Sequence, residues 1–108
     1  MFVEKRIYNV KPGQVHRFLE FVEKEELDMI GQRVNNIIGY YYSEVGELNQ
    51  VIGMWRYDTF EERAAGRSAF HQHPNFPALA DKMLPLMVSQ SSQFLIPAAF
   101  FAKRMQAR

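Results

Sequence analysis

A chain of 108 residues is long enough for one domain with a hydrophobic core, and we expect a single domain over 1–108. Thirteen basic and twelve acidic residues leave a net charge of +1, which argues against nucleic-acid binding. The absence of cysteine excludes disulfides, thiolate metal sites and cysteine nucleophiles. No apolar window approaches the roughly 20 residues of a membrane span, and charges interrupt any signal peptide, so we expect a soluble cytoplasmic protein.

The first predicted elements are a strand and a helix. Residues 2–10 alternate in character and predict a strand that a Pro-Gly pair ends. Apolar residues at helical spacing then predict an amphipathic helix over about 13–32. Its apolar stripe is interrupted by Glu26, where a hydrophobic residue would continue the pattern.

The middle of the chain predicts a hairpin and a capped helix. Residues 37–44 are β-branched and aromatic, and a turn connects them to a third strand over 49–57. Thr59 and Glu62 have the spacing of a capping box, which starts a second helix over about 60–72.

The last part of the chain completes a known pattern. Asn75 precedes a short third helix that Pro85 stops, a last strand follows over 88–97, and about 99–108 is a basic tail. The order is that of an α+β, ferredoxin-like βαββαβ fold, with a four-stranded antiparallel sheet and helices on one face.

The third strand carries most of the functional information. With a period of two, Trp55 and Tyr57 lie on one face with Val51 and Gly53, and Met54 lies on the other. Both faces are rich in residues that avoid water, and so short a chain has helices for only one. We therefore expect the Trp55/Tyr57 face to be bare in one chain and covered by a second copy in a homodimer.

Several segments resemble the NIPSNAP family, over nearly the whole chain. They are Tyr8-Asn-Val-Lys-Pro-Gly13, Gly39-Tyr-Tyr-Tyr-Ser-Glu-Val-Gly46, Leu48-Asn-Gln-Val51, Trp55-Arg-Tyr-Asp58 and Glu62-Arg-Ala-Ala65. The resemblance implies a dimeric α/β barrel, in which two ferredoxin-like subunits close their sheets around a central space. The wider superfamily includes antibiotic-biosynthesis-type monooxygenases and haem-degrading proteins. Many NIPSNAP-like sequences have a histidine where this chain has Gly53.

Aromatic and cationic side chains of the expected bare face are the candidate ligand-binding residues. They are Arg6, Tyr8, Tyr41, Trp55 and Tyr57. Aromatic walls with a guanidinium and phenols suit a planar or apolar small molecule that carries an oxygen or a carboxylate. Alternatively, these residues fill a dimer core, with Arg6 paired to Glu4 or Glu44. The register of the second strand leaves open whether Tyr41 or a neighbouring tyrosine faces the site.

His71 and His73 are the candidate catalytic residues. The resemblance implies this, because similar histidine-containing helix ends border the cleft in the monooxygenase-like relatives, where a histidine can transfer protons. The alternative is a polar helix end and turn. Side chains two residues apart on a helix point in different directions, so we expect no metal site. The chain has no glycine-rich phosphate loop, and we expect no cofactor.

The sequence therefore predicts a protein that binds a small apolar or aromatic molecule in the cleft of a dimer. Such a protein could be a cofactor-free enzyme of the monooxygenase or isomerase type. The alternative is a non-catalytic protein-interaction module. An accessible cavity lined by polar groups distinguishes the first prediction from the second.

Overall fold

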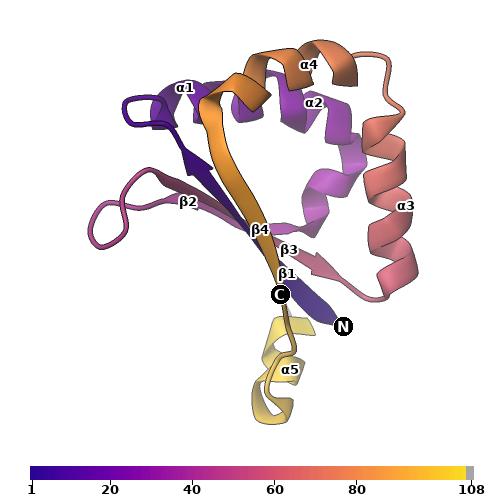
Figure 1. Cartoon of the computed structure of the whole chain (residues 1–108). Helices are drawn as coiled ribbons and strands as arrows, with labels where there is room; N and C mark the ends of the chain where they lie inside the picture. The colour runs from indigo at the N-terminus through magenta and orange to yellow at the C-terminus, as the bar shows by residue number, and fades with distance from the viewer. Residues whose placement is uncertain (107–108) are drawn as a thin grey trace.

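The computed structural model describes residues 1–106 and shows one sheet with its helices on one side (Figure 1). The elements are β1 (Phe2–Val10), α1 (Val15–Phe21), a π-helical turn (Val22–Glu26), α2 (Leu27–Ile30), a 3-10 segment (Gly31–Asn36), β2 (Ile37–Tyr42), β3 (Gln50–Tyr57), α3 (Phe60–His71), α4 (Phe76–Met83), a 3-10 turn (Leu84–Leu86), β4 (Met87–Leu95) and α5 (Ala99–Gln106).

The sheet has the strand order β2-β3-β1-β4, and each pair is antiparallel. This topology confirms the predicted α+β, ferredoxin-like fold. In a single chain the sheet is open, with β2 and β4 at its edges, so a closed barrel requires a second copy.

The first helix differs from the prediction. In place of one helix over about 13–32, α1 and α2 are separated by the π-helical turn, and a 3-10 segment extends to Asn36. Glu26, which interrupts the apolar stripe, is the last residue of the π-helical turn. Such turns place an additional residue in the helix and occur frequently at functional sites.

The predicted capping box forms at the start of α3. Thr59 Oγ1 accepts a hydrogen bond from the Glu62 amide at 3.1 Å. Glu62 Oε2 reaches back to the amide of Asp58 at 2.8 Å, one residue further than the standard box. These two bonds satisfy backbone donors that the first turn leaves unpaired and fix where α3 begins.

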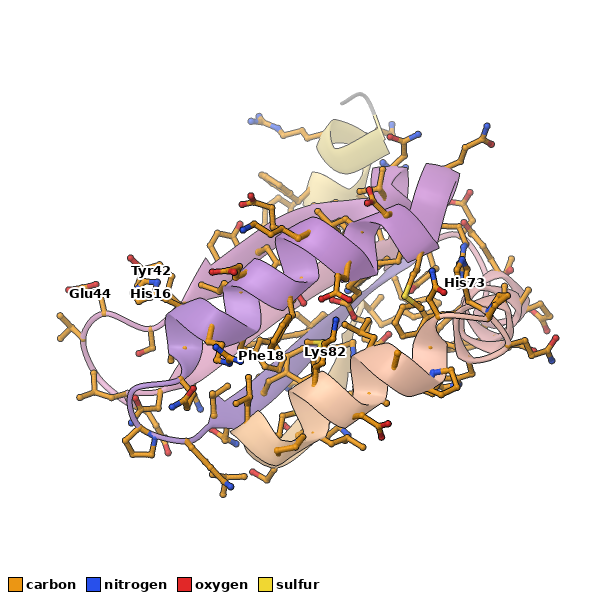
Figure 2. All side chains as sticks on the ribbon, turned by 90° about the horizontal axis from the view of Figure 1, so that it is seen from above. His16, Phe18, Tyr42, Glu44, His73 and Lys82 are labelled. Atoms are coloured by element: carbon orange, nitrogen blue, oxygen red, sulfur yellow. The ribbon has the colours of Figure 1, made fainter. Side chains whose placement is uncertain are left out.

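The hydrophobic core lies between the sheet and the helices α1, α2 and α4. Phe18 of α1 and Val51 of β3 are fully buried at its centre. Figure 2 shows Phe18 and Lys82 between α1 and α4, which lie side by side over the sheet, and Lys82 Nζ binds Glu25 Oε1 at 2.8 Å. The remaining buried members are Val10, Val22, Met29, Leu79 and Met83.

The prediction of which sheet face is bare was wrong. The face with Trp55 and Tyr57 is the one that the helices cover, and Tyr57 is buried. The bare face carries Ile52 and Met54, together with Tyr41, which pairs with Ile52 and is 54% exposed. Alternation along a strand separates two sets of residues, but it contains no information on which set the helices cover.

The expected C-terminal tail of about 99–108 contains α5, which lies beyond the sheet and away from the other helices (Figure 1). Residues 107–108 lie outside the described part of the chain. Within the described residues, no helix is long and apolar enough to cross a membrane.

Candidate functional site

A cleft lies between the sheet and α3, which has no buried residue of its own. The cleft holds about 590 Å³ of empty space, partly open to solvent. A second compartment, whose space of about 640 Å³ is also partly open to solvent, continues toward α4. The residues that line both compartments are Arg6, Tyr8, Glu26, Arg67 and Phe70.

The structure brings four of the five predicted ligand-binding residues to this cleft. Arg6, Tyr8, Trp55 and Tyr57 all line it, although the cleft lies under the chain's own helices rather than at a face for a second copy. Tyr41 points to the bare face, so its predicted place in the same site was wrong. A bulge early in β2 sets the register, which pairs Tyr41 with Ile52.

A buried ion-pair network adjoins the cleft through Arg6, which lines it. Glu4 is fully buried, and its two oxygens accept from Nε and Nη2 of Arg63, both at 2.9 Å. Arg6 Nη1 lies 3.2 Å from Glu4 Oε2, as one of the alternative pairings predicts. Burial alone would raise the pKa of Glu4, but hydrogen bonds from Arg63 and Ser92 and the arginine charges outweigh burial, so the pKa is lowered.

Arg6 orients Tyr8 in the cleft. Arg6 Nε donates to the Tyr8 hydroxyl oxygen at 2.8 Å, while its Nη groups are held by Ser92 and Gln90 of β4 at 3.3 Å. Burial raises the pKa of Tyr8, which keeps the phenol protonated at neutral pH. Because the Tyr8 oxygen already accepts a hydrogen bond from Arg6, the Tyr8 hydroxyl is left to donate its own proton in a hydrogen bond to a ligand.

Glu26 is the functional candidate that the sequence analysis missed. It lines both compartments, and the Tyr40 hydroxyl donates to Glu26 Oε2 at 3.5 Å. Burial raises the pKa of Glu26 to about 7, although the charges of Arg6 and Arg67 and the Tyr40 hydrogen bond act in the opposite direction. The sequence signal was the acidic residue in the apolar stripe, since a carboxylate on a core-facing stripe needs a specific reason to be there.

Aromatic rings form the walls of the cleft. The rings of Trp55 and Tyr57 are nearly parallel, with centroids 6.4 Å apart and an interplanar angle of 3°. Gly53 makes room beside them, because a Cβ there would lie 3.1 Å from Tyr40 Cε2 and 3.4 Å from Trp55 Nε1. A larger residue at position 53 would displace these rings and reshape the wall.

Side chains from the segment before β2 tie α3 to the rest of the rim. Arg33 Nη1 donates to the Gly66 carbonyl in α3. Asn36 Nδ2 donates to Glu62 Oε1 at 2.9 Å and to the Arg56 carbonyl at 2.7 Å. These contacts hold α3 at a distance from the sheet that leaves the cleft open.

The two candidate histidines have different positions. His71 lines the second compartment, stacks edge-on against Phe76 at 4.9 Å, and has its pKa lowered by burial and by the charges of Arg67 and Arg6. His73 lies in the turn before α4, where its Nδ1 accepts from the Asn75 amide at 3.0 Å, and it lines neither compartment. Within residues 1–106, no group of three or more histidines and carboxylates is arranged to hold a metal ion.

Comparison with known proteins agrees with this architecture. The NIPSNAP family model matches residues 3–102, and the chain belongs to the NIPSNAP family. The chain is 30% identical over 97 residues to the human protein NipSnap homolog 3B, covering 90% of this chain and 39% of the human protein. A solved NIPSNAP domain protein of Burkholderia xenovorans is 36% identical, with a TM-score of 0.84 over 93% of this chain and 97% of that chain.

More distant structures share the fold alone. A dimeric ferredoxin-like protein from an uncultured marine organism is 13% identical, with a TM-score of 0.71 over 91% of this chain and 88% of that one. A protein of Nitrosomonas europaea named for antibiotic biosynthesis monooxygenases is 14% identical, with a TM-score of 0.60 over 90% and 98% of the two chains. The chain spans about 39% of the length of the human relative, so it corresponds to one part of that longer protein.

Proposed function

We propose that the chain binds a small apolar or aromatic molecule in the cleft between the sheet and α3 and moves a proton on it. The observation that carries this proposal is Glu26, a carboxyl with a pKa of about 7 that faces an open cavity beside two tyrosines. A carboxyl with such a pKa exchanges protons near neutral pH, which suits a general base. The aromatic walls supply the contacts for a flat ligand.

The chemistry that this geometry supports is an isomerisation by proton transfer. The Glu26 carboxylate takes a proton from a carbon next to a carbonyl, and the electron pair of the broken C–H bond moves onto the carbonyl oxygen as an enolate. Tyr8 donates a hydrogen bond to that oxygen, and the protonated Glu26 then returns the proton to the enolate at a different atom. The reaction is balanced without a cofactor.

Phenylpyruvate is a suitable probe, because it has a planar ring and an acidic C–H beside a carbonyl. We expect the protein to accelerate exchange of the C3 protons in D₂O, measured by proton NMR, and Glu26→Gln to slow it by about 10²–10⁴-fold. Glu20→Gln is the matched control, since Glu20 lies in α1, just before the π-helical turn, in an exposed ion pair with Lys24. Equal rates for the wild type and Glu26→Gln would contradict the proposal. No acceleration in a folded protein would favour the interaction module.

The bare sheet face supports a homodimer as the second part of the proposal. Ile52 and Met54 are only partly buried there, and Tyr41 is 54% exposed. An apolar surface of this kind is typically covered by a partner, and a second copy with the same face closes the two sheets on each other.

Native mass spectrometry tests the dimer. We expect a dimer for the wild type and a monomer for Ile52→Lys, because a buried unpaired charge opposes association. Gln32→Lys, at an exposed position near the cleft rim, is the control that stays dimeric. A wild-type monomer at micromolar concentration would contradict the covered-face argument.

A further inference from the structure

Arg67 differs from the other arginines beside the cleft. Arg33 donates to the backbone carbonyls of Ile30 and Gly66. Arg6 and Arg63 share the carboxylate of Glu4. Arg67 lines both compartments, and its Nη2 lies 3.4 Å from His71 Nε2. In the described part of the chain, no carboxylate lies within 4.0 Å of the Arg67 guanidinium.

The charged side chains that line the cleft between the sheet and α3 do not sum to zero. Arg6, Arg33 and Arg67 face Glu26 and Glu62, which leaves one positive charge in excess even when both carboxylates are ionised. The Glu4–Arg63 pair below adds no net charge. Burial, together with the charges of Arg6 and Arg63, lowers the pKa of Arg67, and the opposite effect of the Glu4 charge is smaller.

We propose that Arg67 binds the carboxylate of the ligand, so that the ligand is a small monocarboxylic acid with a flat apolar body. A guanidinium offers two parallel N–H donors that match the two oxygens of a carboxylate, and a single negative charge neutralises the excess. Trp55 and Phe70 lie in the same lining and supply apolar surface for the rest of the molecule. This inference rests on the proposed function, because it assigns the ligand of the same cleft.

The fluorescence of Trp55 measures binding directly, because Trp55 is the single tryptophan of the chain and lines the cleft. The probes are phenylacetate and its neutral analogue phenylacetamide, which have similar shape and differ in charge. The variants are Arg67→Gln, Arg67→Lys and the control Arg17→Gln, since Arg17 is exposed on α1 and contacts the Phe21 ring away from the cleft.

We expect the wild type and Arg17→Gln to bind phenylacetate more tightly than phenylacetamide. Arg67→Gln should weaken phenylacetate binding about 10- to 100-fold, the range expected for hydrogen bonds to a charged group, and leave phenylacetamide binding unchanged. Arg67→Lys should retain part of the preference, because it keeps the charge and loses the paired donors. This pattern would support the inference.

Two results would overturn it, and they differ in what they say about the cleft. Equal affinity of Arg67→Gln and the wild type for phenylacetate would exclude Arg67 as the carboxylate site. Binding of phenylacetamide without a preference for the acid would also exclude it, while ligand binding in the cleft would stand. If neither probe changes the Trp55 signal at millimolar concentration, both the inference and ligand binding in the cleft fail. The phenylpyruvate exchange experiment then shows whether the proposed function fails as well. It reports on Glu26 and on the site as a whole, and not on Arg67 alone.

Discussion

The helix layer is packed at one end and open at the other. At the packed end, α1 and α4 contact each other over the sheet, and Phe18 and Val51 are fully buried. At the open end, α3 has no buried residue and holds Arg63 and Arg67 over charged and aromatic side chains. One face of one sheet therefore carries both a hydrophobic core and a polar cleft. The core stabilises the fold, and the cleft remains accessible to solvent.

Truncating one aromatic ring at each end tests this contrast most strongly. Phe18→Ala leaves a cavity in the packed end and should lower the free energy of unfolding by about 3–5 kcal/mol. Phe70→Ala, at the half-buried lining of the cleft, should cost less than about 2 kcal/mol, because solvent can fill the space. Urea denaturation followed by circular dichroism measures both. Equal losses would contradict the division into two ends.

The buried ion pair beside the cleft is the one place at the open end where we expect a substitution to cost much stability. Glu4→Gln removes the buried charge that Arg6 and Arg63 share and leaves two cations together. We expect a loss of about 3 kcal/mol in the free energy of unfolding at pH 7, because breaking a buried pair leaves uncompensated charge. The same denaturation experiment checks it, and a loss below 1 kcal/mol, roughly the value of an exposed pair, would place Glu4 outside a buried network.

Glu26 should give the open end a pH dependence that the packed end lacks. Its pKa rises from 4.5 to about 7 in the folded chain, so between these values the folded state holds a proton that the unfolded state has released. Stability therefore falls as pH rises from about 4.5 to 7 by up to about 3 kcal/mol, and the loss is complete above the folded pKa.

Replacing this carboxyl isolates its effect. Glu26→Gln should match the wild type in stability at pH 4, where Glu26 is protonated in both states, and exceed it by up to about 3 kcal/mol at pH 8. Denaturation curves of the two proteins at a series of pH values give the difference, in which other titrating groups cancel. A difference that does not vary with pH would rule out the raised pKa.

The smallest expected effect is at the start of α3. Thr59→Ala removes the hydrogen bond to the Glu62 amide and should lower the free energy of unfolding by about 1 kcal/mol. Thermal denaturation measures the loss, and Ser at the same position should restore most of it. An unchanged stability in Thr59→Ala would show that the Glu62 bond to Asp58 alone holds this end.

The periodicity of the sequence predicted the fold, because strand alternation and helical spacing are local properties. It also grouped Trp55 with Tyr57 and placed Arg6 and Tyr8 at one site. It did not predict which face the helices cover, because Glu4 and Arg6 make that face polar and the ion pair of Glu4 with Arg63 of α3 is a tertiary contact. The bulge in β2 shifts the register by an amount that no local pattern encodes, so Tyr41 was placed on the wrong face.

Glu26 was visible in the sequence as an irregularity, but its environment in the folded chain was not. The break in the apolar stripe was visible, but the π-helical turn and the approach of Tyr40 and Arg67 depend on the folded chain. A pKa near 7 arises from that environment, because an exposed glutamate in a helix titrates near its ordinary value. The role of Glu26 therefore required the structure.

The most direct test of the account is the titration of Glu26 itself. In protein labelled with ¹³C at the glutamate carboxyl, the Glu26 resonance, assigned by its absence in Glu26→Gln, should titrate with a midpoint of about 7. A midpoint between 4 and 5, the ordinary range of a glutamate side chain, would contradict a proton acceptor in the cleft and with it the proposed reaction.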